Sequence, residues 1–435
     1  MVSVGLVSTD SKVCSSFRGR ARTLSRARPW NQVLKTSYGS VRVIPLPTGT
    51  HQAWLLAETP WRGSMKLRRA AGWSALAISL VLVATASVAY WTAGNSCDVR
   101  ETASAPAHPM QAWIYCDYGS PDVLRLERVE RPTPGDHEIL IRIRAAAVNP
   151  LDWHYVRGLP YIVRLGGGLR KPKVIQLGVD FAGTVEGVGK LVTHFKPGDE
   201  VFGGRTGAFA EYVAVREDGA VALKPANMTF EQAATVAIAA VTALQGLRDK
   251  GKIQPGQRVL INGASGGVGT FAVQIAKAYG AQVTGVNSTR NVELVRSIGA
   301  DSVIDYTKSD YTKGAQRYDI ILDNVGNRAL SDNRRILTSK GRYVLIGGGG
   351  ANDGQWLGPL IGAIKAMVVS RFVSQELGMH LAELNTHDLI VLRDLMLAGK
   401  VTPVIDRRYP LNEVPAAIRY LEAGRARGKV VITLE

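Results

Sequence analysis

NGASGGVGT, residues 262 to 270, is the stretch of sequence that decides the fold. It is close to the dinucleotide-binding pattern G-x-G-x-x-G, with Ala264 where the first glycine is expected. The apolar run QRVLI precedes it, and GVGTFAVQIAKAYGA follows it with apolar residues at helical spacing. This context predicts a strand, a tight turn and a helix whose free N–H groups face a diphosphate, although an ordinary glycine-rich turn is the alternative. The residues predicted to hold the diphosphate are Ala264, Ser265, Gly266, Gly267, Val268 and Gly269.

The chain on either side of this loop shows two patterns. Residues 110–229 contain short strand-like runs separated by turn residues, which is typical of a β-barrel or sandwich. In residues 230–375 helical and strand-like runs alternate, and this predicts a doubly wound parallel sheet. Residues 376–435 return to strand-like runs that we expect to complete the first domain. The predicted fold class is therefore α/β.

The N-terminal part of the chain has a different composition. Residues 1–100 hold 13 Lys and Arg against 3 Asp and Glu, so most of the net charge of +17 lies outside the two domains, which argues against nucleic-acid binding. Residues 1–64 show no hydrophobic period, and we expect a disordered or targeting segment. This segment is either an organelle transit peptide or upstream sequence that follows from a wrong start. Residues 94–109 are expected to form a linker.

An uncharged apolar run lies between these two segments. It covers 22 residues, 70 to 91, which is enough to cross the roughly 30 Å hydrocarbon layer. We expect residues 65–93 to be a single-pass transmembrane anchor, with a membrane localisation whose side the sequence leaves open. A cleavable signal peptide is the alternative.

Several further motifs, together with the loop, point to one family. They are YGSPDVL (118–124), VNPLDW (148–153), GVDFAGTVEGVG (178–189), PGDEVFG (197–203) and TALQGL (242–247). With them the chain from about Gln111 onward resembles the medium-chain dehydrogenase/reductase superfamily, and within it the zinc-independent quinone oxidoreductase (zeta-crystallin-like) branch. The resemblance implies a GroES-like substrate domain at 110–229, a Rossmann NADP-binding domain at 230–375, and an active site in the cleft between them.

The resemblance also bears on metal binding. Zinc-dependent relatives place a cysteine and a Gly-His-Glu where this chain has Asn149 and the run Gly178–Asp180, so we expect no metal. The cysteines Cys14, Cys97 and Cys116 are widely spaced and provide neither a metal-binding pattern nor a disulfide framework.

Without a metal, the substrate carbonyl must be polarised by hydrogen-bond donors. Asn149 is the predicted donor, and Asp152 is predicted to fix its loop and to relay a proton through water. An ordinary turn and helix start is the alternative for both residues. Tyr155 and Thr242 are predicted to line the same cleft, and His154 is either a proton donor or a packing residue.

The run GVNSTRN, residues 285–291, decides between the two nicotinamide cofactors. It has no acid that could bind a ribose 2′-OH, whereas Ser288 and Arg290 suit a 2′-phosphate, so the predicted cofactor is NADPH. The resemblance implies that Tyr306 lies beside the adenine and that Asn324 and Gly347 lie on the nicotinamide side.

The predicted enzyme is an NADPH-dependent, metal-free oxidoreductase that transfers hydride to a quinone or an α,β-unsaturated carbonyl, with a lipophilic small molecule as substrate. Two alternatives are an alcohol/ketone dehydrogenase of the same superfamily and a non-catalytic dinucleotide-binding sensor or structural protein. We expect a homodimer formed through the strand GRYVLIGG (341–348) as a sheet edge. The apolar stretch 356–373 is expected to be a helix at the cleft or dimer edge, or a lipid-contact surface.

Overall fold

The structure is a computed structural model. It describes residues 106–347 and 360–434, together with the backbone of 33–36, 39–45 and 54–58 and the helical residues 81–85 and 87. The chain divides into two compact units, residues 1–89 and 90–435, which are described separately.

The first unit contains three described strands, β1 (Val33–Thr36), β2 (Gly39–Pro45) and β3 (Trp54–Glu58). They pair in the order β1-β2-β3, and both pairs are antiparallel. These strands lie within residues 1–64, for which the sequence predicts a disordered or targeting segment. The strands are short, and Lys35 and Arg42 interrupt the apolar residues of the first two, so the sequence did not indicate them.

The transmembrane anchor predicted for residues 65–93, and the membrane localisation that followed from it, are corrected. Among the residues that the structure describes, no helix combines the length and the apolar character that a membrane span requires. A span needs about 20 consecutive apolar helical residues. The structure describes helical backbone in that segment only at 81–85 and 87, and the other residues of the predicted span lie outside the described residues.

The first domain of the second unit is built on a seven-stranded sheet in the order β10-β8-β7-β6-β18-β17, with β9 also paired to β6. The C-terminal strand β18 pairs antiparallel with β6, with Val430 opposite Val148, so the end of the chain completes this domain. The strands of the domain are β4 (Pro109–Ile114), β5 (Arg125–Glu130), β6 (Glu138–Val148), β7 (Asp180–Val188), β8 (Glu200–Gly204), β9 (Tyr212–Arg216), β10 (Val221–Leu223), β17 (Ile405–Pro410) and β18 (Lys429–Thr433). Its helices are α2 (Pro150–Arg157), α3 (Val163–Gly167) and α11 (Val414–Glu422).

Cys116 follows strand β4 and is disulfide-bonded, which the sequence analysis did not expect. The other two cysteines lie outside the described residues.

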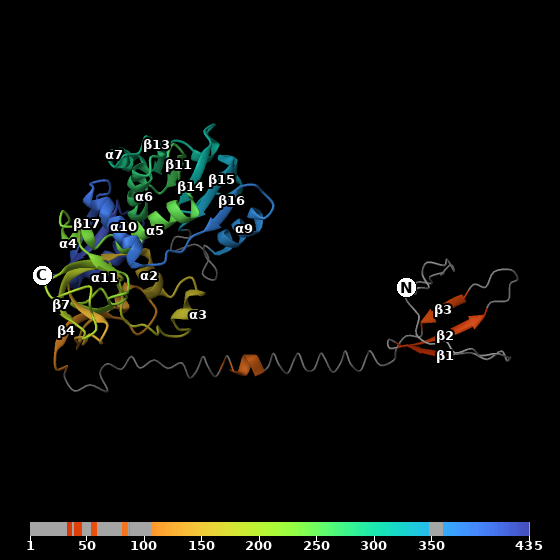
Figure 1. Cartoon of the computed structure of the whole chain (residues 1–435), viewed down its shortest axis with the longest axis horizontal. Coiled ribbons are helices and arrows are strands. Elements are labelled where there is room, and N and C mark those ends of the chain that lie inside the picture. The colour runs from red at the N-terminus through yellow and green to blue at the C-terminus, as the bar shows by residue number, and fades with distance from the viewer. Residues whose placement is uncertain are drawn as a thin grey trace. The chain divides into compact units, whose positions relative to one another are not determined.

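The second domain is a six-stranded parallel sheet in the order β13-β12-β11-β14-β15-β16. Numbered along the chain, this is the 3-2-1-4-5-6 order of a dinucleotide-binding sheet, whose ligands bind where the order reverses, at β11. In Figure 1 the blue C-terminal elements α11 and β17 lie with the first domain, whereas the blue strand β16 lies in the second. The strands are β11 (Arg258–Asn262), β12 (Gln282–Asn287), β13 (Ser302–Asp305), β14 (Tyr318–Asp323), β15 (Leu337–Leu345) and β16 (Glu376–Met379).

Strand β15, which contains most of the predicted edge GRYVLIGG, pairs with β14 on one side and with β16 on the other. The edge of the sheet on this side is therefore β16, and the predicted edge is wrong. The sequence around β16 has little β-branched character, so it gave no strand signal.

The helices of the second domain alternate with its strands along the chain, as the sequence predicts. They are α4 (Phe230–Ala233), α5 (Ala237–Gln245), α6 (Gly267–Ala278), α7 (Val292–Ser297), α8 (Leu330–Arg335), α9 (Leu360–Ser370) and α10 (Thr386–Leu397). The largest core packs α5 and α6 on the sheet, and it also takes in Ala145, Ala182 and Val431 from the first domain. This shared core fixes the glycine loop relative to the first domain.

Candidate active site

The glycine loop joins β11 to α6 as the sequence predicts. Gly263 has a positive φ of 76°, so it is the turn glycine, one position before Ala264. Ala264 is fully buried. A Cβ added to Gly285 of β12 would lie 3.0 Å from the Cβ of Ala264. A Cβ on Gly269 would lie only 2.1 Å from the carbonyl oxygen of Gly263. Only glycine at 269 therefore allows the helix to pack this closely on the turn, with its first N–H groups free for an anion.

The other predicted diphosphate residues form the first turn around this point. Gly266 is the N-cap of α6, and a Cβ there would have only the carbonyl oxygen of Gly263 within 4 Å, at 3.5 Å. Gly267 begins the helix, and Val268 packs against the largest core. Ser265 Oγ accepts a hydrogen bond of 2.9 Å from Asn291 Nδ2.

The two residues predicted for the 2′-phosphate follow the end of β12. Asn291 Nδ2 also lies 3.5 Å from Ser288 Oγ, so one amide links Ser265 of the glycine loop to Ser288. Arg290 Nη2 donates to the carbonyl oxygen of Arg425, which belongs to the turn before β18. The structure thus brings Ser288 and the glycine loop together, and adds a basic C-terminal turn that the sequence analysis did not include.

The remaining predicted cofactor residues lie at the ends of their strands. The Tyr306 N–H donates to the carbonyl oxygen of Asn287, and its side chain is half exposed. Asn324 Nδ2 donates to the carbonyl oxygen of Asn262 over 2.9 Å, and its Oδ1 is buried without a partner among the described residues. A Cβ on Gly347 would lie 2.5 Å from the Asn324 carbonyl oxygen, so these two residues are neighbours.

Asn149 and Asp152 form a buried polar cluster with two residues that the sequence analysis did not select, Asp180 and Lys429. All four side chains are at most 3% exposed. Asn149 Nδ2 donates to Asp180 Oδ2 (3.0 Å) and to the carbonyl oxygen of Ala147 (3.3 Å). Lys429 Nζ donates to Asn149 Oδ1 (2.6 Å) and to Asp180 Oδ2 (3.1 Å). Both amide protons of Asn149 are therefore already engaged.

Asp152 closes the turn that carries Asn149. Its Oδ2 accepts the Asn149 N–H over 2.7 Å, and its Oδ1 accepts the Gly178 N–H over 3.2 Å. Burial raises the pKa of Asp152 to about 7, and the nearby Asp180 carboxylate acts in the same direction, while the two N–H bonds and Lys429 lower it. This carboxyl group thus acts as the turn and helix-start residue that was the alternative for Asp152. It also joins α2 to Gly178, which lies two residues before β7.

Of the other predicted residues, His154 and Tyr155 lie on α2 and Thr242 lies on α5. Thr242 is buried, and its Oγ1 donates to the Ile238 carbonyl oxygen over 2.6 Å, while the Ile238 N–H donates to Asp180 Oδ1. Tyr155 has 36% of its side chain exposed. The His154 Nδ1 lies 2.7 Å from the Leu159 carbonyl oxygen, which can only accept, so this nitrogen carries the proton. Burial lowers the pKa of His154.

One feature of the sequence could have indicated that Lys429 is paired, but none indicated that its partner is Asp180. Lys429 opens an otherwise apolar and buried strand, KVVIT, where a charge is costly unless it is paired. Asp180 stands in the motif GVDFAGTVEGVG, but its partner Lys429 is 249 residues away. No local pattern could connect the two.

The residues at the position of the zinc ligands do not fit a zinc ion. The Asn149 amide is bonded on both sides, Val179 is apolar, and the Asp180 carboxylate is paired with the ammonium group of Lys429. Across residues 106–347 and 360–434, no three His, Cys, Asp or Glu side chains are grouped so that they could hold a metal ion.

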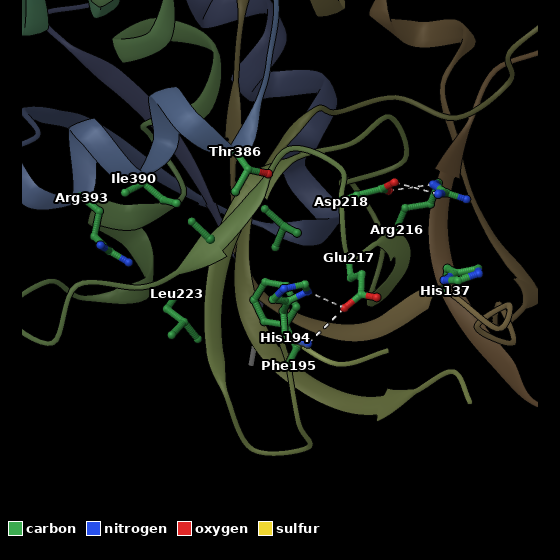
Figure 2. A pocket seen from close by; sticks show the side chains of 12 residues that line it. His137, His194, Phe195, Arg216, Glu217, Asp218, Leu223, Thr386, Ile390 and Arg393 are labelled. Carbon is green, nitrogen blue, oxygen red and sulfur yellow. Dashed lines mark hydrogen bonds and ion pairs between the residues drawn. The ribbon is translucent and has the colours of Figure 1, made fainter. Parts of the chain in front are cut away.

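A cavity of about 420 Å³ lies between the connection from β9 to β10, the loop at His194 and Phe195, and α10. Figure 2 shows the side chains that line it. His194 Nδ1 lies 3.0 Å from Glu217, and Arg216 pairs with Asp218 at 2.8 Å. None of the lining residues belongs to the glycine loop or to the buried polar cluster. We therefore do not assign this cavity to the reaction.

The fold and this site define a class of enzyme: a dinucleotide-binding sheet with its glycine loop packed on a β-domain that the C-terminal strand completes. Residues 135–226 match the model of the alcohol dehydrogenase GroES-like domain, and residues 298–432 match that of the zinc-binding dehydrogenase. The chain belongs to the medium-chain dehydrogenase/reductase superfamily and is an NAD(P)H-dependent oxidoreductase.

Three similar proteins narrow the class. The 2-methylene-furan-3-one reductase of Solanum lycopersicum is 36% identical over 78% of this chain and 84% of its own. The chloroplastic NADPH-dependent alkenal/one oxidoreductase of Arabidopsis thaliana is 34% identical over 78% and 83%. The structure of the quinone oxidoreductase from Coxiella burnetii matches with a TM-score of 0.66 and 29% identity, over 75% of this chain and all of that one. The predicted family, enzyme class and NADP-type cofactor are confirmed.

Proposed function

We propose that this enzyme uses NADPH to reduce a quinone or the carbon–carbon double bond of an α,β-unsaturated carbonyl. The observation that carries the proposal is that the glycine loop lies next to the buried polar cluster. A Cβ added to Gly267 of the loop would lie 3.2 Å from Cδ of Lys429 in the cluster. The relatives named for alkenal, furanone and quinone reduction support the same substrate class. Bound NADPH would supply the hydride, and the residues of this chain would position the acceptor.

The roles of the predicted catalytic residues change in this proposal. Asn149 has no free amide proton for a substrate carbonyl, so we assign it, with Asp152, to holding the turn at the start of α2. Tyr155, on the same helix and partly exposed, is the proposed donor of the proton that completes the reduction. Thr242 is assigned to the support of Asp180 through Ile238.

The test measures the consumption of NADPH by its absorbance at about 340 nm. The enzyme is offered a panel of quinones, enones and simple ketones. We expect turnover with the quinones or the enones. Turnover with simple ketones alone would favour an alcohol/ketone dehydrogenase. Binding of NADPH without consumption across the panel would favour a non-catalytic binding protein, and either result would overturn the proposal.

We predict that NADPH is preferred over NADH because of Arg290. Replacing Arg290 with Ala removes a charge-assisted hydrogen bond to the 2′-phosphate, so NADPH affinity should fall by about 1.5 to 3 kcal/mol while NADH affinity changes little. Arg296→Ala is the matched control, because Arg296 pairs with Glu293 on the surface of α7. An equal loss for both cofactors, measured by fluorescence titration, would refute the assignment.

We also propose that the enzyme is a homodimer, formed through the edge strand β16 and the neighbouring helix α9. Strand β16 has a paired neighbour on one side only in the described sheet. On α9 and just beyond it, Ile364, Met367, Val368 and Phe372 are each more than half exposed. A second copy that pairs with the edge strand would cover these side chains.

Light scattering should give a dimer mass at micromolar concentration. Phe372→Glu should raise the dimer dissociation constant about 30-fold or more, since a central aromatic contact contributes roughly 2 kcal/mol. Leu165→Glu, on an exposed leucine of α3 in the other domain, should leave the mass unchanged. A wild-type monomer at micromolar concentration would contradict the dimer, and liposome binding by that monomer would favour lipid contact instead.

A further inference from the structure

The buried ammonium group of Lys429 joins two parts of the molecule that belong to different domains. Its side chain is 3% exposed, and that of its partner Asp180 is 0% exposed. One end of the lysine contacts Asn149, at the start of α2 in the first domain. Its aliphatic stem runs beside Gly267, at the start of α6 in the second domain.

The hydrogen bonds fix the orientation of the Asn149 amide without ambiguity. An ammonium group can only donate, so the atom 2.6 Å from Lys429 Nζ is the amide oxygen. A carboxylate can only accept, so the atom 3.0 Å from Asp180 Oδ2 is the amide nitrogen. Lys429 therefore determines both the rotamer and the direction of the side chain that begins α2.

The stem of Lys429 also lies beside the glycine loop. A Cβ on Gly267 would lie 3.2 Å from Lys429 Cδ and 3.6 Å from the carbonyl oxygen of Gly428. The backbone around Lys429 is held as well, because its N–H donates to the Val404 carbonyl oxygen and β18 pairs with β6 at Val148. A displacement of Gly267 toward β18 would therefore meet the lysine stem and the Gly428 carbonyl oxygen.

Burial alone does not explain this arrangement. Lys224 is nearly as buried, with 5% of its side chain exposed, and bonds to Glu200 at 3.0 Å and to the Met228 carbonyl oxygen at 2.6 Å. Glu200 begins β8 and Met228 lies just before α4, so neither partner belongs to the glycine loop or to α2. Lys224 is therefore a matched control for a buried lysine that only stabilises the fold.

We propose that Lys429 is a positioning residue that couples occupation of the cofactor loop to the geometry of the Asn149–Asp152 turn. NADPH at the start of α6 would restrain Gly267, and Lys429 would transmit this restraint to α2, which carries Tyr155. The inference rests on the proposed function for its catalytic consequence. Its structural part requires only that NADPH binds.

The first test measures the coupling without turnover. Hydrogen exchange of residues 149–157 should slow at least fivefold when NADPH binds the wild-type enzyme. The double variant Lys429→Met/Asp180→Asn removes both buried charges together, so it leaves no unpaired ion and should fold. It should bind NADPH within about threefold of wild type but lose the protection of this segment. Retained protection would overturn the proposal.

The second test measures the chemical step in a single turnover with excess enzyme. The double variant should transfer hydride at least tenfold more slowly, because small misplacements of a reacting pair have large rate effects. In a separate steady-state measurement, the KM of the double variant for NADPH should differ from that of the wild-type enzyme by less than threefold. Lys224→Met should lower thermal stability but keep the single-turnover rate within twofold.

The outcomes separate the two proposals. If the wild-type enzyme binds NADPH with protection of residues 149–157 but reduces no acceptor, the proposed function fails and the coupling stands. If the wild-type enzyme turns over and the folded double variant is equally fast, the coupling fails and the proposed function stands. If the wild-type enzyme does not bind NADPH, both fail.

Discussion

Replacing Gly269 with alanine should reduce NADPH affinity at least 100-fold, which corresponds to about 2.7 kcal/mol or more. The added methyl group would lie 2.1 Å from the Gly263 carbonyl oxygen and 2.8 Å from the backbone of Ala264. Backbone atoms cannot rotate away as a side chain can, so the turn and the helix must separate. The N–H groups of the first turn would then no longer converge on one anion.

Two further substitutions distinguish this effect from general damage. Gly166→Ala in α3 places a methyl group where no atom lies within 4 Å, so it should change neither stability nor binding. Gly266→Ala has room in the fold, with its nearest atom at 3.5 Å, so it should keep the stability but weaken NADPH binding by blocking the approach of the diphosphate. Near-normal NADPH binding by a folded Gly269→Ala protein would show that this loop does not hold the cofactor.

The contribution of Asp152 to the free energy of unfolding should depend strongly on pH. Burial raises its pKa to about 7 in the folded protein, whereas an ordinary aspartate has a pKa of 3.8, so between these limits the folded state holds a proton that the unfolded chain has lost. Stability from this group is therefore full below about pH 4 and is lost as the pH rises toward 7. The loss is on the order of 4 kcal/mol, because one pKa unit is worth about 1.4 kcal/mol.

Urea denaturation of the wild-type enzyme and of Asp152→Asn, at about pH 4.5 and 7.5, measures this contribution as a difference. Other carboxylates titrate in both proteins and cancel in the comparison. The wild-type enzyme should lose more stability than the variant between the two pH values. A parallel pH dependence of the two proteins would mean that Asp152 is ionised in the fold at acidic pH and would contradict the raised pKa.

Local sequence was sufficient for the two-domain architecture. An apolar run before the loop at 262–270 predicts a strand, and the spacing of apolar residues after it predicts a helix. Both patterns depend only on neighbouring residues. The parallel order of the second sheet follows from its alternation of helices and strands. The edge strand was missed because ELGM, at 376–379, contains no β-branched residue. It becomes a strand through its pairing with β15.

The candidate site was predictable only in part. The arrangement of residues within the glycine loop, such as Ser265 and Gly269, follows from the motif because it depends on the local turn. The orientation of the Asn149 amide could not be predicted from the motif, because it depends on Lys429, which lies 280 residues later. A buried cluster of this kind depends on which strands pair, and pairing of β18 with β6 is a long-range property.

The most direct test of the central claim follows the hydrogen itself. The wild-type enzyme is incubated with an enone and with NADPH that carries deuterium at C4 of the nicotinamide, in separate reactions with each C4 position labelled. We predict that one of the two labelled cofactors gives a saturated ketone with deuterium on the β-carbon, detected by mass spectrometry and NMR, together with an equal amount of NADP+. Deuterium at the carbonyl carbon, or a product without deuterium from both labelled cofactors, would contradict the account.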